Sequence, residues 1–145
     1  MKIFALSVAM AAALVQAGSD RPPMRNVGSM SDLMVKIIYP TSDALFYIET
    51  RTPQTDAEWT ALEGQALMLA ESANLLMMPG RARDQKQWVE DAKLMLDAGA
   101  AAVKAAKTKN VEAISALSDQ LLESCTTCHK HYRPGYGQKP KPPID

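Results

Sequence analysis

The stretch NVEAISALSDQLLESCTTCHKHYR, residues 110–133, combines a helical pattern with an unusual group of side chains. Its apolar residues recur every three or four positions, which predicts an amphipathic helix, and Asn110 is placed to cap its start. The predicted core stripe comprises Ile114, Leu117, Leu121, Cys125, Cys128 and Tyr132. Both cysteines of the chain therefore fall on the core face of its last helix.

Three further segments carry the same helical periodicity. Apolar stripes predict a first helix from Met30, a second from Thr55 to the Pro79-Gly80 pair, and a third from about residue 88 to the turn at 107–110. Thr55 and Glu58 have the spacing of a capping box, in which each side chain accepts a hydrogen bond from the other residue's free backbone N–H. The third segment is rich in alanine, which predicts close packing against its neighbour.

The first helix contains a proline near its middle. Pro40 lacks a backbone N–H, and its ring clashes with the preceding turn, so we expect it to kink or break the helix. Ser42 or Asp43 would then cap a second piece that runs to Ile48.

Four amphipathic helices with mostly short connections predict an all-α fold, an antiparallel four-helix bundle. The 145 residues are enough for one hydrophobic core but not comfortably for two. The 16 basic and 16 acidic side chains balance and form no long run of one sign, which argues against nucleic-acid binding.

The two ends of the chain differ from the predicted bundle domain at 18–136. Lys2 is followed by an apolar run from Ile3 to Val15 and then by small residues, which is typical of a cleaved signal peptide over 1–17. The run is shorter than the roughly 20 residues that span a bilayer. We therefore expect a periplasmic protein without stable membrane insertion, although a buried N-terminal helix or an anchor is the alternative. The Pro-rich segment 137–145 predicts a flexible tail.

The spacing of Cys125, Cys128 and His129 indicates covalent haem attachment. Residues three apart lie on one side of a helix, so the two thiols can reach the two vinyl groups of one haem, and the imidazole can bind its iron. A redox dithiol would normally lie at a helix N-terminus after a strand. A zinc site that adds His131 would usually draw ligands from a distant segment, and a disulfide would close only a tiny loop. We expect one haem c per chain.

A signal peptide, a four-helix bundle and the motif CTTCHKHYR together resemble the cytochrome c prime family and its low-spin relatives. The resemblance covers the mature chain to about Tyr136. It implies that Cys125 and Cys128 carry the haem, that His129 is the proximal ligand, and that the first helix covers the opposite haem face. It also implies that Arg133 lies beside the proximal ligand. From its position alone, Arg133 can reach a haem propionate or the imidazole, or be solvated at the helix end.

The sixth iron ligand depends on the first helix. By the resemblance, an apolar residue blocks this position in five-coordinate members of the family, and a methionine fills it in low-spin members. Met30 and Met34 lie one turn apart on the same face, and either can be a ligand or simply core packing. We prefer Met34, because it lies farther from the fraying start of the helix, with Met30 as the alternative.

These predictions combine into a periplasmic mono-haem cytochrome that carries single electrons and is not an enzyme. Its expected partner is a redox protein, attracted by a weakly basic rim at Lys130, Arg133, Lys139 and Lys141, although a solvated helix end is an equal alternative. Two other functions stay open: a five-coordinate haem protein that binds diatomic gases, and a haem-free metal carrier. The sequence leaves dimer formation undecided.

Overall fold

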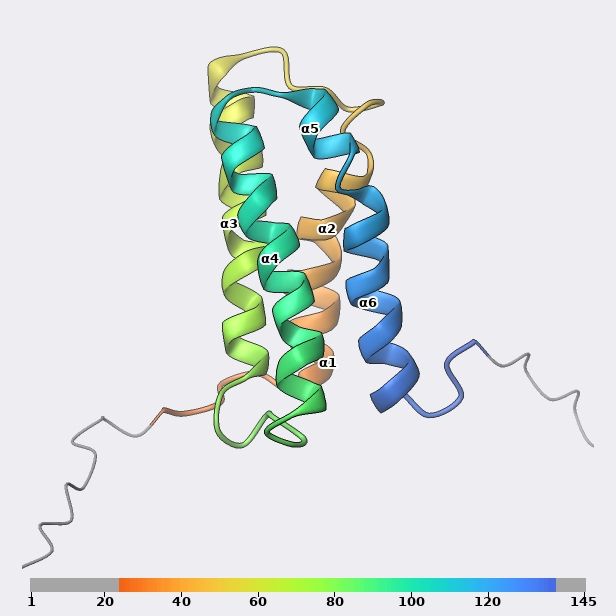
Figure 1. Ribbon diagram of the computed structural model, residues 1–145. Helices are drawn as coiled ribbons and strands as arrows, with labels where there is room; N and C mark the ends of the chain where they lie inside the picture. Colours follow the sequence, from red (N-terminus) through yellow and green to blue (C-terminus); the bar gives the residue numbers. More distant parts are fainter. Residues whose placement is uncertain (1–23, 138–145) are drawn as a thin grey trace, which may run out of the picture.

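The computed structural model describes residues 24–137, and every regular element in this range is helical (Figure 1). The predicted signal peptide at 1–17 and all but the first residue of the predicted tail at 137–145 lie outside the described residues. The elements are α1 (Met30–Leu33), the π-helical turn η1 (Met34–Ile38), α2 (Tyr39–Phe46), α3 (Asp56–Leu76), α4 (Gln87–Lys107), α5 (Val111–Ser115) and α6 (Ser118–Tyr132).

These elements form four columns that run side by side (Figure 1). The segments α1, η1 and α2 follow one another without a gap and make up the first column, while α3, α4 and α6 are the others. Successive columns run in opposite directions, and the short α5 lies at the end of the bundle between α4 and α6. The all-α four-helix bundle predicted from the sequence is confirmed over the described residues. None of its helices is both long enough and apolar enough to cross a membrane.

Local capping signals in the sequence set two of the helix starts as predicted. The Thr55 hydroxyl accepts a hydrogen bond from the Glu58 backbone N–H at 3.2 Å, and the Glu58 carboxylate accepts one from the Thr55 N–H at 2.9 Å. The Asn110 side chain accepts a bond from the Ala113 N–H at 2.9 Å and caps α5. Each cap satisfies backbone donors that the first helical turn leaves free.

The predicted alternatives at Pro40 were a kink or a break, and the break is wrong, because the first column continues through the proline. The turn before it, η1, is π-helical, and the Tyr39 N–H bonds to the Met34 carbonyl five residues earlier. This wider turn contains one extra residue, which accommodates a ring that an α-helical turn would exclude. Ser42 does not restart a helix, since its hydroxyl donates to the Tyr39 carbonyl at 3.0 Å inside α2. The helix ends at Phe46, two residues earlier than predicted.

The last helix is also not continuous, because residues 116–117 separate α5 from α6. At this point the Leu117 N–H bonds to the Ile114 carbonyl three residues back, at 3.0 Å, which tightens the chain locally. The resulting bend lets Ile114 and Leu121 both lie fully inside the bundle. The predicted stripe is therefore confirmed at Ile114 and Leu121, and Leu117 and Tyr132 pack against the core. Its two cysteines are only half-buried, and the break between α5 and α6 was not predicted.

The core runs the full length of the bundle between two buried tryptophans, Trp59 and Trp88. Its largest fully buried apolar side chains are Leu45, Ile48, Leu69, Ile114 and Leu121. The alanine-rich α4 packs closely on α3, as predicted. A Cβ atom added to Gly99 would lie only 2.8 Å from the backbone of Ala70, so glycine is needed where these helices approach.

Candidate functional site

The half-buried side chains of Cys125, Cys128 and His129 lie in the second half of α6. This helix packs mainly against α4 and touches α2 only sparsely. The side of α6 that faces the first column is consequently where the bundle is open. Met34 comes to this opening from the π-helical turn of the first column.

Three cavities surround this opening, and two residues line all of them. A groove of about 820 Å³, a small internal cavity of about 40 Å³ and a third cavity of about 190 Å³ each have Met34 and His129 in their walls. Cys125 lines the groove and the internal cavity, and Cys128 lines the internal and the third cavity. The structure thus brings the Met34 thioether to the same cavities as both thiols and the imidazole. In the sequence, Met34 is more than 90 residues away from these three groups.

The groove is large and mostly apolar. Its volume lies within the range of about 300–1,000 Å³ that is common for cofactor sites. Several of its lining side chains are unusually exposed for their type: Val35 is 65% exposed, Tyr39 68% and Leu122 54%. Val35 and Tyr39 belong to the first column and Leu122 to α6, so both helical columns contribute apolar walls to the groove. A flat apolar group bound there would remove this surface from water.

The two cysteines are free thiols whose surroundings favour the protonated form. Burial raises the pKa of Cys125, an effect opposed by the Ser124 hydroxyl at 3.9 Å. Burial, followed by the charges of Asp91 and Cys125, raises the pKa of Cys128 to about 11. Reactive redox dithiols require the opposite environment, in which positive charge lowers a thiol pKa. The site therefore does not favour the redox-dithiol alternative.

The imidazole of His129 is in a suitable state to bind a metal. Its partial burial lowers its pKa, and the positive charge of Arg133 lowers it further, so the ring is neutral at pH 7 and keeps a free lone pair. The Tyr136 ring lies against it, with a distance of 5.1 Å between ring centroids. Arg133 ends α6, and its guanidinium lies 5.9 Å from the centre of the Tyr136 ring. Sequence reasoning did not identify Tyr136 as part of the site.

Of the two candidate methionines, Met34 has the more central position. Both are partly buried and pack on the core. Met34 shares all three cavities with His129, whereas Met30 shares only the third, beside Cys128 and Arg133. The preference for Met34 as an iron ligand stays a prediction, and this arrangement agrees with it.

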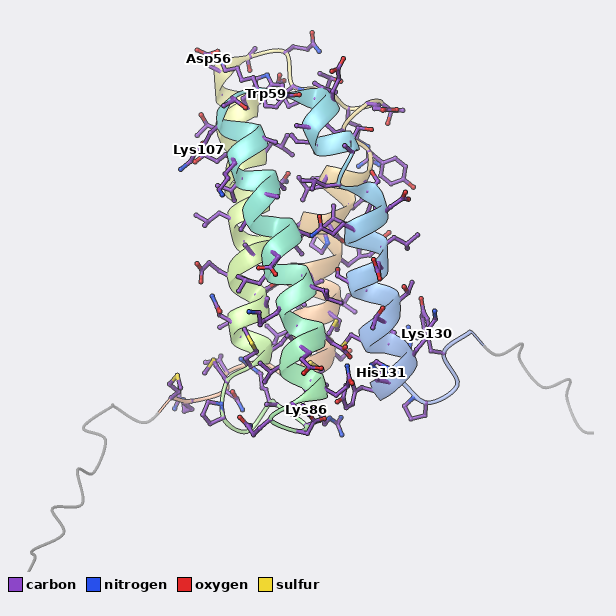
Figure 2. The ribbon with its side chains drawn as sticks, in the orientation of Figure 1. Asp56, Trp59, Lys86, Lys107, Lys130 and His131 are labelled. Atoms are coloured by element: carbon purple, nitrogen blue, oxygen red, sulfur yellow. The ribbon has the colours of Figure 1, made fainter. Side chains whose placement is uncertain are left out.

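A buried carboxylate next to the site was not anticipated. Asp91 of α4 is only 2% exposed and lines the internal cavity. His131 Nδ1 lies 2.7 Å from one of its oxygens, and the Gln87 amide donates to the other at 3.0 Å. Figure 2 shows His131 at the lower end of α6, on its α4 side. A signal was present in the sequence, because Asp91 lies on the same helical stripe as Trp88 and Met95.

A second polar contact fixes the end of α6. The Tyr132 hydroxyl donates a hydrogen bond to Asp84 in the loop before α4, and its ring packs edge-on against Trp88 at 4.8 Å. Burial and this bond raise the pKa of Tyr132 to about 12. Both α4 and the loop before it thus hold the segment of α6 that carries the motif.

No protein-family model, curated protein or solved structure matches this chain.

Proposed function

We propose that the protein is a periplasmic c-type cytochrome that carries single electrons. In this proposal Cys125 and Cys128 hold one haem through thioether bonds, His129 binds the iron on one side, and Met34 binds it on the other. A haem bound in this way would supply a one-electron redox centre. The periplasmic location follows from the predicted signal peptide and from the need to attach haem outside the cytoplasm.

The observation that carries this proposal is the shared position of Met34 and His129. An iron ligand pair must approach the metal from opposite sides, and these two residues come from different columns to the same three cavities. The chemistry of the donors also fits. A neutral imidazole and a thioether are the ligand pair that raises the reduction potential in cytochromes of the c type. The apolar groove would exclude water and disfavour the more highly charged ferric state.

The chain's own residues have separable tasks in this function. The thioether links would prevent loss of the cofactor, while Met34 would tune the potential and close the iron to other ligands. The exposed side chain of Lys130 provides positive charge for an acidic redox partner. Figure 2 shows Lys130 near the lower end of α6. Lys139 and Lys141, two other members of the predicted rim, lie outside the described residues.

A second candidate function is the binding of a diatomic gas at a five-coordinate haem. The groove favours it in one respect: its apolar walls at Val35, Ile38 and Phe46 would admit a small neutral molecule next to Met34. In this case Met34 would pack near the iron without binding it.

Two measurements on the protein from periplasmic expression test these proposals. Intact mass should equal the chain without residues 1–17 plus one haem, and Cys125→Ser or Cys128→Ser should each lose one thioether bond. A chain mass without haem would overturn the proposed function. The spectrum of the reduced protein should be low-spin and should change little with carbon monoxide. A high-spin spectrum with rapid carbon monoxide binding would instead support the gas-binding function.

A further inference from the structure

Two guanidinium groups lie at the third cavity although they come from distant parts of the chain. Arg83 belongs to the loop between α3 and α4, and Arg133 ends α6. Both side chains line the cavity of about 190 Å³ that also contains Met30, Cys128 and His129. Sequence reasoning did not connect Arg83 with the site, because 50 residues separate it from Arg133.

Two carboxylates that hydrogen-bond to α6, Asp84 and Asp91, are already engaged. Asp84 accepts hydrogen bonds from the Tyr132 hydroxyl and from two backbone N–H groups of the loop and α4. Asp91 is bonded to an amide and an imidazole side chain. Within residues 24–137, neither Arg83 nor Arg133 takes part in an ion pair. The third cavity therefore has two positive charges without a negative partner in the described part of the chain.

The large groove has the opposite character. Its ionisable lining groups are Asp43, the His129 ring, the Cys125 thiol and tyrosine hydroxyls, and none of its lining residues is a lysine or an arginine. The Asp43 carboxylate pairs with Arg51 at 2.7 Å, so the positive charge of Arg51 is already compensated. The lining of the groove thus offers a carboxylate no cation, whereas the lining of the third cavity offers two guanidinium groups.

We propose that Arg83 and Arg133 together bind the two propionate carboxylates of the haem. The inference rests on the proposed function, since it needs haem in the site. Vinyl and propionate groups occupy opposite edges of a haem. With the vinyl edge held by Cys125 and Cys128, the propionate edge would lie beyond the iron and its His129 ligand, and Arg133, one helical turn after His129, lines the third cavity together with Arg83. A guanidinium fork matches the geometry of a carboxylate, and two forks balance two propionates.

The test compares haem-loaded Arg83→Gln with two controls. Lys86→Gln removes an equal charge from the same loop, and Lys86, like Arg83, is exposed, but it lines none of the three cavities around the site (Figure 2). Arg83→Lys keeps the charge without the fork. The measurements are the resonance Raman bands of the propionate bending vibrations and the reduction potential at low and high salt.

We expect Arg83→Gln to shift the propionate bands and to lower the potential, because a propionate without its partner stabilises the ferric state. Arg83→Lys should restore part of both effects. Lys86→Gln should leave the bands unchanged and cause only a small potential shift that salt removes. If Arg83→Gln behaves like Lys86→Gln while haem is bound, the arginine proposal is wrong and the proposed function stands. If no haem is attached to the unmutated protein, both are wrong.

Discussion

The close approach of α3 and α4 at Gly99 makes a quantitative prediction about stability. Replacing Gly99 by alanine would place a Cβ 2.8 Å from the Ala70 backbone N and Cα, and 2.9 Å from its Cβ. Contacts this short do not persist between real atoms, so the two 21-residue helices must move apart. The obstacle is helix backbone, which cannot turn aside as a flexible side chain can.

The size of the effect follows from two opposing contributions. Overpacking of a core typically costs about 1–3 kcal/mol, and a contact with rigid backbone lies at the upper end of that range. Alanine has a higher helix propensity than glycine by about 1 kcal/mol, which offsets part of this cost. Gly99→Ala should therefore lower the free energy of unfolding by about 1–2 kcal/mol, given the balance of these contributions. For a domain of this size the melting temperature should fall by roughly 4–8 °C.

Gly64 provides the matched control. It lies in α3, is exposed, and a Cβ atom added to it would meet nothing within 4 Å. Gly64→Ala should gain only the propensity term and raise the free energy of unfolding by up to about 1 kcal/mol. Thermal unfolding followed by far-ultraviolet circular dichroism measures both variants. If Gly99→Ala stabilises the protein as much as Gly64→Ala does, the helices do not approach as closely as described, and the packing argument fails.

Three further predictions concern the site and its supports. Met34→Ala should open the iron to carbon monoxide, lower the reduction potential and abolish the sulfur-to-iron charge-transfer band of the ferric spectrum. Met30→Ala should keep the band; if only Met30→Ala loses it, Met30 is the ligand. Tyr132→Phe should reduce thermal stability at pH 7, because its bond to Asp84 helps to hold the pKa of that carboxyl below its ordinary value of 3.8. This contribution is present above that value and is lost as the pH falls below it, so the two melting temperatures should converge in acid; a constant difference would contradict the bond. Asp91→Ala should cost roughly 1–3 kcal/mol in a urea unfolding experiment, because the buried carboxylate is hydrogen-bonded to two side chains, Gln87 and His131, and each such bond contributes roughly 0.5–1.5 kcal/mol. Unchanged stability would contradict these bonds.

The features that were predicted correctly from the sequence depend on neighbours along the chain. The capping box of Thr55 and Glu58 and the Asn110 cap each involve residues three apart. Such hydrogen bonds can be predicted from residue types and their spacing alone. The apolar stripes likewise identify the core face of each helix. The spacing of Cys125 and Cys128 on one helix is local in the same sense.

What the sequence did not reveal depends on three-dimensional packing. A proline inside a helical pattern can end the helix or be accommodated by a wider turn, and the letters around Pro40 do not distinguish the two; the structure has the wider turn. The contacts of His131 with Asp91, 40 residues away, and the position of Arg83 beside the motif arise only when the loop before α4 meets α6. Periodicity assigns each of these side chains to a helix face or a loop, but it does not indicate which residues from distant parts of the chain they contact.

The π-helical turn also fixes how the two parts of the first column face relative to each other. Each residue in an α-helix advances the side-chain direction by about 100°, and the wider turn takes up one residue more than an α-helical turn would. If the same residues were wound as a uniform α-helix, Met34 would turn by about 100° relative to the fully buried Leu45. The width of this one turn therefore decides that the methionine and the core residues of α2 can both be satisfied. A single residue can be added to or removed from such a turn while the helices on either side keep their places in the bundle.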